Sequence, residues 1–177
     1  MNNTRRNITI NFVISTTLAV IFGTAITTTN MAWADNINCT SGVTCNGTSR
    51  DDTMSGSAGS YKMFGLAGND EMHGGAGGGN DIMSGGSGAD TMFGNAGNDN
   101  MNGDSSDDFI VGGDNADILK GSSGNDKIFH WLDRGTSSVL LDGSKDTIDC
   151  GSGNDEAWIN TSFDHDTAVN CETVHTR

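Results

Sequence analysis

Residues 47–129 read GTSRDDTMS, GSAGSYKMF, GLAGNDEMH, GG, AGGGNDIMS, GGSGADTMF, GNAGNDNMN, GDSSDDFIV, GGDNADILK and GSSGNDKIF, a nine-residue period held over nine copies. Position 1 is glycine in eight copies, with Ala76 the exception, and Gly74 and Gly75 form a two-residue insertion. Position 6 is aspartate in eight copies, with Tyr61 the exception. A short period repeated this often is typical of a solenoid.

Each copy combines a polar turn with a short strand centred on position 8, which is apolar throughout. Glycine at positions 1 and 4 permits positive φ, and Asn or Asp at position 5 tolerates the left-handed region. One copy cannot bury its apolar side chain alone, but stacked copies share a continuous core between parallel ladders. The sequence therefore predicts an all-β fold, a parallel β-solenoid or β-roll. The position 8 side chains are Met54, Met63, Met72, Met83, Met92, Met101, Ile110, Leu119 and Ile128.

The methionines in this column have two interpretations. Thioether sulfurs are soft ligands of the kind that copper(I) accepts, and His73 lies next to the column. Unbranched, flexible methionine side chains also fill narrow cores well. We favour the core interpretation, because Ile110, Leu119 and Ile128 continue the column without sulfur.

Position 6 supplies a column of carboxylates. Stacked copies would place these like charges in register, where they repel, unless a hard cation lies between the turns. Calcium prefers carboxylate and carbonyl oxygens, and a glycine-rich turn offers both. The alternative is that these aspartates are ordinary turn formers in a metal-free solenoid. The candidate metal ligands are Asp52, Asp70, Asp81, Asp90, Asp99, Asp108, Asp117 and Asp126, with Asp146 and Asp155 from two later, degenerate copies.

The repeat resembles the nonapeptide G-G-x-G-x-D-x-U-x of RTX (repeats-in-toxin, haemolysin-type) calcium-binding proteins. The resemblance covers residues 47–129 and weakly continues to about residue 159. It implies a parallel β-roll with two nonapeptides per turn, in which several calcium ions lie between turns, bound by position 6 aspartates and turn carbonyls. Alternate copies then share a side. The implied rows are Asp52, Asp70, Asp90, Asp108, Asp126 and, on the other side, Asp81, Asp99, Asp117.

The first 34 residues have the features of a secretory signal peptide. Arg5 and Arg6 precede a mostly apolar stretch over residues 12–26, and Ala32-Trp33-Ala34 is an A-x-A cleavage site. An uncleaved membrane anchor is the alternative. We expect four regions: residues 1–34 as signal peptide, 35–46 as N-terminal cap, 47–129 as β-roll, and 130–177 as degenerate repeats with a C-terminal cap, which includes Trp131, Trp158 and Phe163 packed over the last turn.

The chain is strongly acidic, with a formal net charge of −14. Without residues 1–34 it keeps all 23 acidic residues but seven of nine basic ones, a charge of −16. Such a chain repels nucleic acid and anionic membranes. It also repels itself, and with few large apolar residues it folds poorly unless cations neutralise it.

Four cysteines follow the signal peptide, which is typical of disulfides. Three pairings are possible. Pairing Cys39 with Cys45 and Cys150 with Cys171 is favoured, because each pair then closes one end of the repeat array. Zinc binding is the competing interpretation, although the sequence contains no C-x-x-C pair.

No catalytic motif is present: the chain lacks H-E-x-x-H, G-x-S-x-G and a P-loop. We expect a secreted or cell-surface, non-enzymatic calcium-binding β-roll that folds on binding calcium and serves as a structural component in contact with envelope or matrix polymers. Two alternatives stay open. The chain is an accessory or remnant module of an RTX-type enzyme or toxin whose catalytic part lies on another chain, or a metal-free solenoid that binds ice or sugar.

Overall fold

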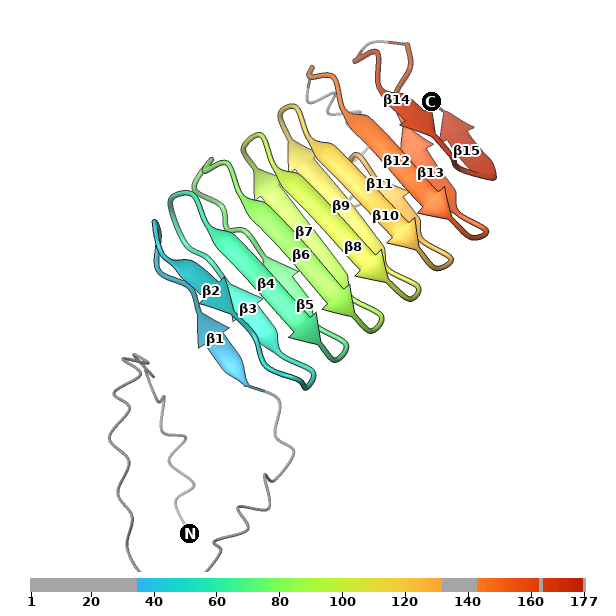
Figure 1. Cartoon of the computed structure of the whole chain (residues 1–177). Helices are drawn as coiled ribbons and strands as arrows, with labels where there is room; N and C mark the ends of the chain where they lie inside the picture. Colours follow the sequence, from blue (N-terminus) through green and yellow to red (C-terminus); the bar gives the residue numbers. More distant parts are fainter. Residues whose placement is uncertain (1–34, 132–142, 163, 177) are drawn as a thin grey trace, which may run out of the picture. The chain divides into compact units, whose positions relative to one another are not determined.

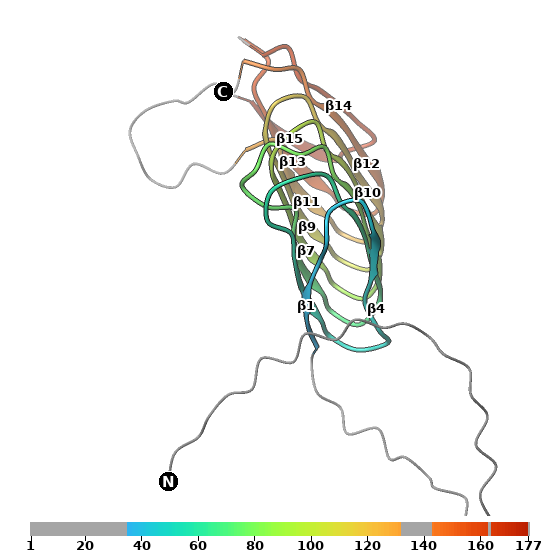
Figure 2. The ribbon, with the colours of Figure 1, turned by 90° about the vertical axis from the view of Figure 1, so that its left-hand side faces the viewer.

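A computed structural model describes residues 35–131, 143–162 and 164–176, and these residues form a parallel β-roll (Figure 1). Each turn of the coil contributes one strand to each of two sheets, so that odd-numbered strands form one sheet and even-numbered strands the other. The view in Figure 2 shows the flattened cross-section of the coil. The predicted all-β fold and parallel β-roll are confirmed.

The two sheets contain eight and seven strands. In spatial order the first sheet contains β1 (Asn36–Asn38), β3 (Thr53–Ser55), β5 (Glu71–His73), β7 (Thr91–Ala96), β9 (Phe109–Asp114), β11 (Lys127–Phe129), β13 (Glu156–Ile159) and β15 (Thr173–Thr176). The second contains β2 (Thr44–Asn46), β4 (Lys62–Ala67), β6 (Ile82–Ser87), β8 (Asn100–Ser105), β10 (Ile118–Ser123), β12 (Thr147–Ser152) and β14 (Thr167–Val169). The repeat therefore extends into both flanking segments, which also supply strands.

Position 8 forms the core. Its nine side chains are at most 1 % exposed, and they pair in register along each sheet, for example Met72 with Met92 and Met92 with Ile110. Positions 7 and 9 point outward, as the alternation of a pleated strand requires. Since all six methionines of the repeat are buried against other apolar residues, the core interpretation of the methionine column is confirmed.

Glycine at position 1 has a different cause from the one that the sequence suggested. Positive φ falls at positions 2 and 4, for example 81° at Leu66 and 117° at Gly68, and position 5 does not adopt it. Position 1 is glycine because there is no space for a side chain: a Cβ at Gly65 would overlap Asp70 Oδ2 and the Gly85 carbonyl oxygen. The expected positive φ at positions 1 and 5 was wrong.

The two-residue insertion also lies elsewhere than predicted. Gly74 N donates a hydrogen bond to Phe93 O at 2.9 Å, as position 1 does in other copies, and a Cβ at Gly74 would overlap Asp81 Oδ2. Gly74 therefore occupies position 1 in place of Ala76, and Gly79 stacks at position 4. The two extra residues lie between Gly75 and Gly79, inside the turn.

Aromatic rings stack along the outer face of the odd-numbered sheet. Ring centroids of neighbours lie 4.2–6.2 Å apart, and the Phe129–Trp158 and Trp158–His175 pairs are nearly parallel. Trp158 thus packs within this aromatic ladder rather than over the last turn, while Phe163 lies outside the described residues. The aromatic ladder consists of His73, Phe93, Phe109, Phe129, Trp158 and His175.

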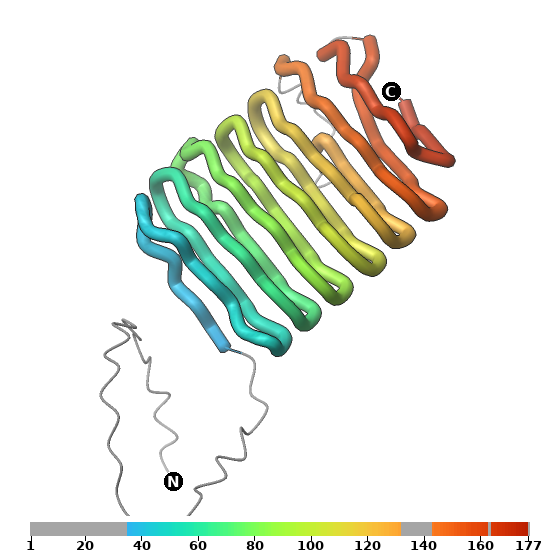
Figure 3. The backbone as a smooth tube through the Cα atoms, in the orientation of Figure 1, coloured from blue at the N-terminus to red at the C-terminus, as the bar shows by residue number. Residues whose placement is uncertain are grey.

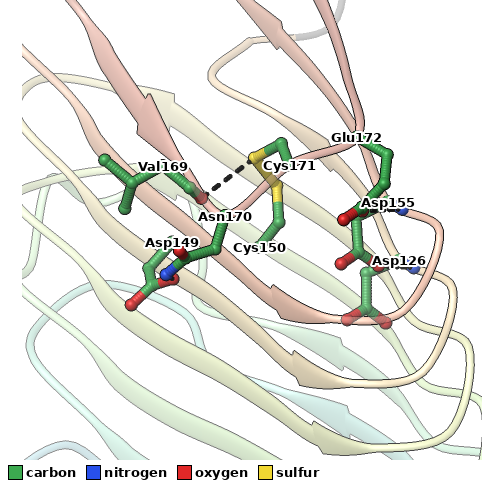
Figure 4. The surroundings of a disulfide bond; sticks show 8 residues. All are labelled: Asp126, Asp149, Cys150, Asp155, Val169, Asn170, Cys171 and Glu172. Carbon is green, nitrogen blue, oxygen red and sulfur yellow. Dashed lines mark hydrogen bonds between the residues drawn. A yellow bond between two sulfur atoms is a disulfide. The ribbon is translucent and has the colours of Figure 1, made fainter.

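Two disulfides close the ends of the roll, and both favoured pairings are confirmed. Cys39 bonds to Cys45 across six residues in the first turn. Cys150 in β12 bonds to Cys171, which lies two residues before the start of β15 (Figure 4). The second disulfide therefore ties the last turn to the one before it.

The predicted signal peptide, residues 1–34, lies outside the described residues and stays a prediction. No helix among the residues described is long and apolar enough to cross a membrane.

Candidate metal centre

The aspartates of position 6 point into the roll, beside the apolar core. Position 6 lies two residues before position 8, so both side chains point to the same face of the chain. All ten candidate aspartates are at most 3 % exposed. A carboxylate this deeply buried loses most of its hydration, and it needs hydrogen bonds, a proton or a cation in compensation.

The structure brings the candidate aspartates together in two rows, and these contain the rows that the resemblance implies. In each row, Oδ1 of one aspartate accepts a hydrogen bond from the backbone N–H of the position 6 residue one turn earlier, at 2.7–2.9 Å. Row 1 contains Asp52, Asp70, Asp90, Asp108, Asp126 and Asp155. Row 2 contains Asp81, Asp99, Asp117 and Asp146.

Both rows continue beyond the residues that the sequence singled out. Asp155 N donates to Glu172 Oε2 at 2.8 Å, and Figure 4 shows Asp126, Asp155 and Glu172 in line. Asp146 N donates to Asp166 Oδ1 at 2.9 Å. Asp166 and Glu172 were missed because the strict nonapeptide has faded there. Their distances of 20 and 17 residues from the preceding row members would have indicated them.

The second carboxylate oxygen, Oδ2, is the one available to bind a cation. In the eight copies from Asp52 to Asp126 that contain a row aspartate, Oδ2 points towards the position 1 glycine of its own copy, where the missing side chain leaves space. In six row members this oxygen is buried and accepts no hydrogen bond, although in Asp52 it accepts one from Thr48 N at 2.6 Å. The six are Asp70, Asp90, Asp99, Asp108, Asp126 and Asp155.

Burial raises the pKa of these carboxyl groups, and neighbouring carboxylates of the same row raise most of them further. The backbone hydrogen bond to Oδ1 opposes the shift only in part. The pKa of Asp108 rises to about 8. Those of Asp81, Asp90, Asp99 and Asp126 rise to about 6, and those of Asp70 and Asp155 also rise. In the absence of a cation, the folded state therefore favours the protonated form of these aspartates.

Position 5 carries a second ladder with a different character. Here the side-chain oxygen accepts from the backbone N–H one turn later, as when Asn125 N donates to Asp107 Oδ1 at 2.7 Å. These side chains are solvent-exposed and mostly amides. Position 5 thus stabilises the stacking of the turns and needs no cation, in contrast to position 6.

Tyr61 replaces the aspartate at the start of row 2. Its hydroxyl accepts a hydrogen bond from Ser57 N at 2.9 Å, the same backbone group that Asp52 Oδ2 uses in its own copy. Tyr61 N in turn donates to Asp81 Oδ1 at 2.7 Å. A neutral phenol therefore fills the carboxylate's place, and the first turn of row 2 has one anionic ligand fewer.

The two rows suit a hard divalent cation. They offer buried oxygen atoms with unused acceptor capacity, and in the described part of the chain no lysine or arginine lies within ion-pair distance of a row carboxylate. An all-oxygen set of carboxylates and backbone carbonyls is the set that calcium prefers. The residues present therefore fit calcium by their donor chemistry.

Comparison with known proteins identifies one family. The sequence model described as RTX calcium-binding nonapeptide repeat matches residues 46–78, 76–110 and 102–136. Together these stretches cover residues 46–136, or 91 of the 177 residues. No curated protein and no solved structure matches the chain. The matched region contains most of both aspartate rows.

Proposed function

Because the chain belongs to the family of RTX calcium-binding nonapeptide-repeat proteins, we propose that it is a secreted, non-enzymatic β-roll that folds as it binds several calcium ions and then serves as a structural component outside the cell. The observation that carries this proposal is the pair of buried aspartate rows. In Asp70, Asp90, Asp99, Asp108, Asp126 and Asp155 the buried Oδ2 accepts no hydrogen bond, which leaves the metal-free fold with an uncompensated cost of burying charge.

The ions would be bound by the row aspartates together with carbonyl oxygens of the glycine-rich turns. Calcium would supply the positive charge that the rows lack, and thereby remove the repulsion between stacked carboxylates. Row 1 offers the more uniform set, because its first member is Asp52 and none of its positions is replaced. The proposed ligands are Asp52, Asp70, Asp81, Asp90, Asp99, Asp108, Asp117, Asp126, Asp146 and Asp155.

Calcium binding and folding would be coupled. The Gly-rich chain loses much conformational entropy on folding, and its core is only one side chain wide on each strand. At ten times its dissociation constant, each ion stabilises the fold by about 1.4 kcal/mol. Five or six ions would then contribute about 7–8 kcal/mol, comparable to the whole stability of a small domain.

The two disulfides and the N-terminal sequence support a location outside the cytoplasm. Disulfides persist in oxidising compartments, and the predicted signal peptide gives a route there. Extracellular calcium modules bind at about 10⁻⁴–10⁻³ M, so the chain would stay unfolded before export and fold outside. A rigid acidic roll with bound calcium is suited to contact envelope or matrix polymers.

Far-UV circular dichroism during calcium titration tests the coupling. The purified protein with both disulfides intact should pass from coil to β-structure near millimolar calcium. Magnesium should not replace calcium, because it demands a smaller, octahedral site, and a chelator should reverse the change. A β spectrum unaffected by chelator would instead mean a metal-free solenoid whose aspartates serve only as turn formers.

The non-enzymatic, structural role needs its own test. The folded protein should show no hydrolytic activity in zymograms, and it should co-sediment with isolated envelope polymers only when calcium is present. Hydrolytic activity of the purified chain would overturn the structural role. Recovery of a stable complex with a separate catalytic chain would favour the accessory-module alternative.

A further inference from the structure

His130 occupies a place that glycine fills in every earlier copy of the repeat. His130 N donates to Trp158 O at 3.1 Å, the hydrogen bond that Gly56 N and Gly74 N make at position 1 of their copies. The Gly112 position stacks on the His130 carbonyl oxygen. His130 is therefore the position 1 residue of the copy whose position 6 residue is Asp146, although 16 positions separate them rather than five.

This substitution puts an imidazole where other copies leave space for a carboxylate oxygen. His130 Nδ1 lies 3.7 Å from Asp146 Oδ2 and 3.5 Å from Asp166 Oδ2. Both carboxylate side chains are fully buried, and the histidine side chain is 14 % exposed. The three potential ligand atoms lie within 4.8 Å of one another. One nitrogen and two carboxylates thus meet at the C-terminal end of row 2.

These distances suit metal ligands better than hydrogen-bond partners. A hydrogen bond between an imidazole nitrogen and a carboxylate is shorter, at about 2.7–3.2 Å, and His130 Nδ1 is buried without a hydrogen bond. Ligands about 2.1 Å from a tetrahedral zinc ion lie about 3.4 Å apart. The observed separations of 3.5 and 3.7 Å match the edges of such a tetrahedron.

The backbone fixes all three side chains in advance. Asp166 accepts hydrogen bonds from Asp146 N at Oδ1 and from Asn160 N at Oδ2, and Asp146 Oδ1 accepts one from Asp117 N. Sheet hydrogen bonds on both sides fix the backbone of His130. Outer hydrogen bonds of this kind orient metal ligands and raise affinity.

We propose that His130, Asp146 and Asp166 bind a divalent transition-metal ion of the zinc type at the C-terminal end of row 2, where this ion takes the place of calcium at Asp146. Calcium takes oxygen ligands, whereas imidazole suits zinc and its neighbours. The ion would neutralise two carboxylates in consecutive turns and tie those turns together. Water would complete the coordination from the exposed side of His130.

Calorimetric titration of zinc into the purified protein in excess calcium tests the proposal. Calcium then fills the other sites of the two rows, so zinc uptake reports the site at His130. One saturable equivalent is expected. His130→Gly restores the residue of the other copies and should keep the fold, yet weaken zinc binding by about a hundredfold or more. His73→Ala is the matched control, because His73 is a surface histidine beside Glu71, and it should bind zinc as the unmodified protein does.

Cobalt provides a readout that needs no variant. Co²⁺ at this site should give the intense visible bands of tetrahedral coordination, and one equivalent of zinc should remove them. Weak octahedral bands alone, zinc uptake that excess calcium abolishes, or equal uptake by His130→Gly would each overturn the proposal. Circular dichroism against calcium runs in parallel, so that a failure of calcium-dependent folding is distinguished from a failure of the zinc site.

Discussion

Each row aspartate uses its two carboxylate oxygens for different purposes. Oδ1 accepts a hydrogen bond from the backbone of the preceding turn, and from Asp52 to Asp126 Oδ2 faces the position 1 glycine. An asparagine could reproduce the first contact but would not supply the charge for the second. An aspartate-to-asparagine substitution at position 6 therefore separates the structural contribution of the side chain from its contribution to cation binding.

Asp108→Asn should weaken calcium binding by about tenfold or more and reduce the number of ions bound, because it removes one anionic ligand from the middle of row 1. The control is Asp107→Asn, one residue earlier, where the exposed side chain can still accept from Asn125 N. Calorimetric calcium titration compares the two. Equal loss in both variants would contradict a special role for position 6.

Gly65→Ala should destabilise the calcium-loaded roll by about 3 kcal/mol, because its Cβ would overlap Asp70 Oδ2 and a backbone carbonyl. Gly42→Ala is the comparison. Its Cβ enters open space but its φ is +78°, so that only the backbone strain of about 1 kcal/mol applies. Chemical denaturation measures both, and a milder effect at Gly65 than at Gly42 would count against the steric explanation.

At the scale of elements, a row behaves as one electrostatic unit. Successive carboxyl groups of row 1 raise one another's pKa in addition to the effect of burial. The row should therefore respond to protons as well as to calcium. Either one removes the net negative charge that the metal-free fold must otherwise bury.

Acid should fold the calcium-free protein. The pKa values of seven row carboxyls are higher in the fold than the value of about 3.9 in an unfolded chain, so protonation of these groups favours the folded state. This stabilisation is complete below about pH 4 and is lost as the pH rises through about 6 to about 8, where the row carboxyls ionise. Circular dichroism in chelator against pH measures it. Stability that rises with pH over this range would contradict the assignment.

The aromatic ladder is an element that the nonapeptide does not specify, since its rings come from outward positions. Trp158→Ala should lower the unfolding free energy by about 1–3 kcal/mol, because Trp158 stacks between Phe129 and His175 and each ring pair contributes about 0.5–1.5 kcal/mol. Trp131→Ala, which removes a half-buried tryptophan outside the ladder, should have a smaller effect. Thermal denaturation with saturating calcium compares them.

At the scale of the whole molecule, every turn rests on its neighbours, so the ends are the weakest part of the array. The disulfide between Cys150 and Cys171 closes a loop of 21 residues at one end. Its removal in the variant Cys150→Ser/Cys171→Ser should cost about 3 kcal/mol. Hydrogen exchange should then accelerate in β14 and β15 and stay unchanged in β6–β9. Uniform acceleration throughout the roll would show that it unfolds as one unit.

The period predicted the solenoid and its core, because residues at equal spacing must stack when copies stack, and the resemblance to RTX repeats divided the aspartates into two rows. The spacing of two residues between positions 6 and 8 is consistent with inward-pointing aspartates, but it did not show how deeply the carboxylates are buried. The contact of His130 with Asp166 was also hidden. His130 and Asp146 are 16 residues apart rather than five, and no local pattern encodes that spacing.

The two edges of the roll differ in regularity. Every row 1 turn, from Gly47–Asp52 to Cys150–Asp155, has the same length. These turns form the regular lower edge of the roll in Figures 1 and 3. The row 2 edge contains Tyr61, the enlarged turn after Gly75 and the His130 copy. The row 1 turns thus keep a constant length, whereas the row 2 turns tolerate inserted residues. Peptides inserted between Gly75 and Gly79 should therefore be displayed at the surface with the coil intact. The roll would then be a scaffold for engineered loops whose presentation depends on calcium.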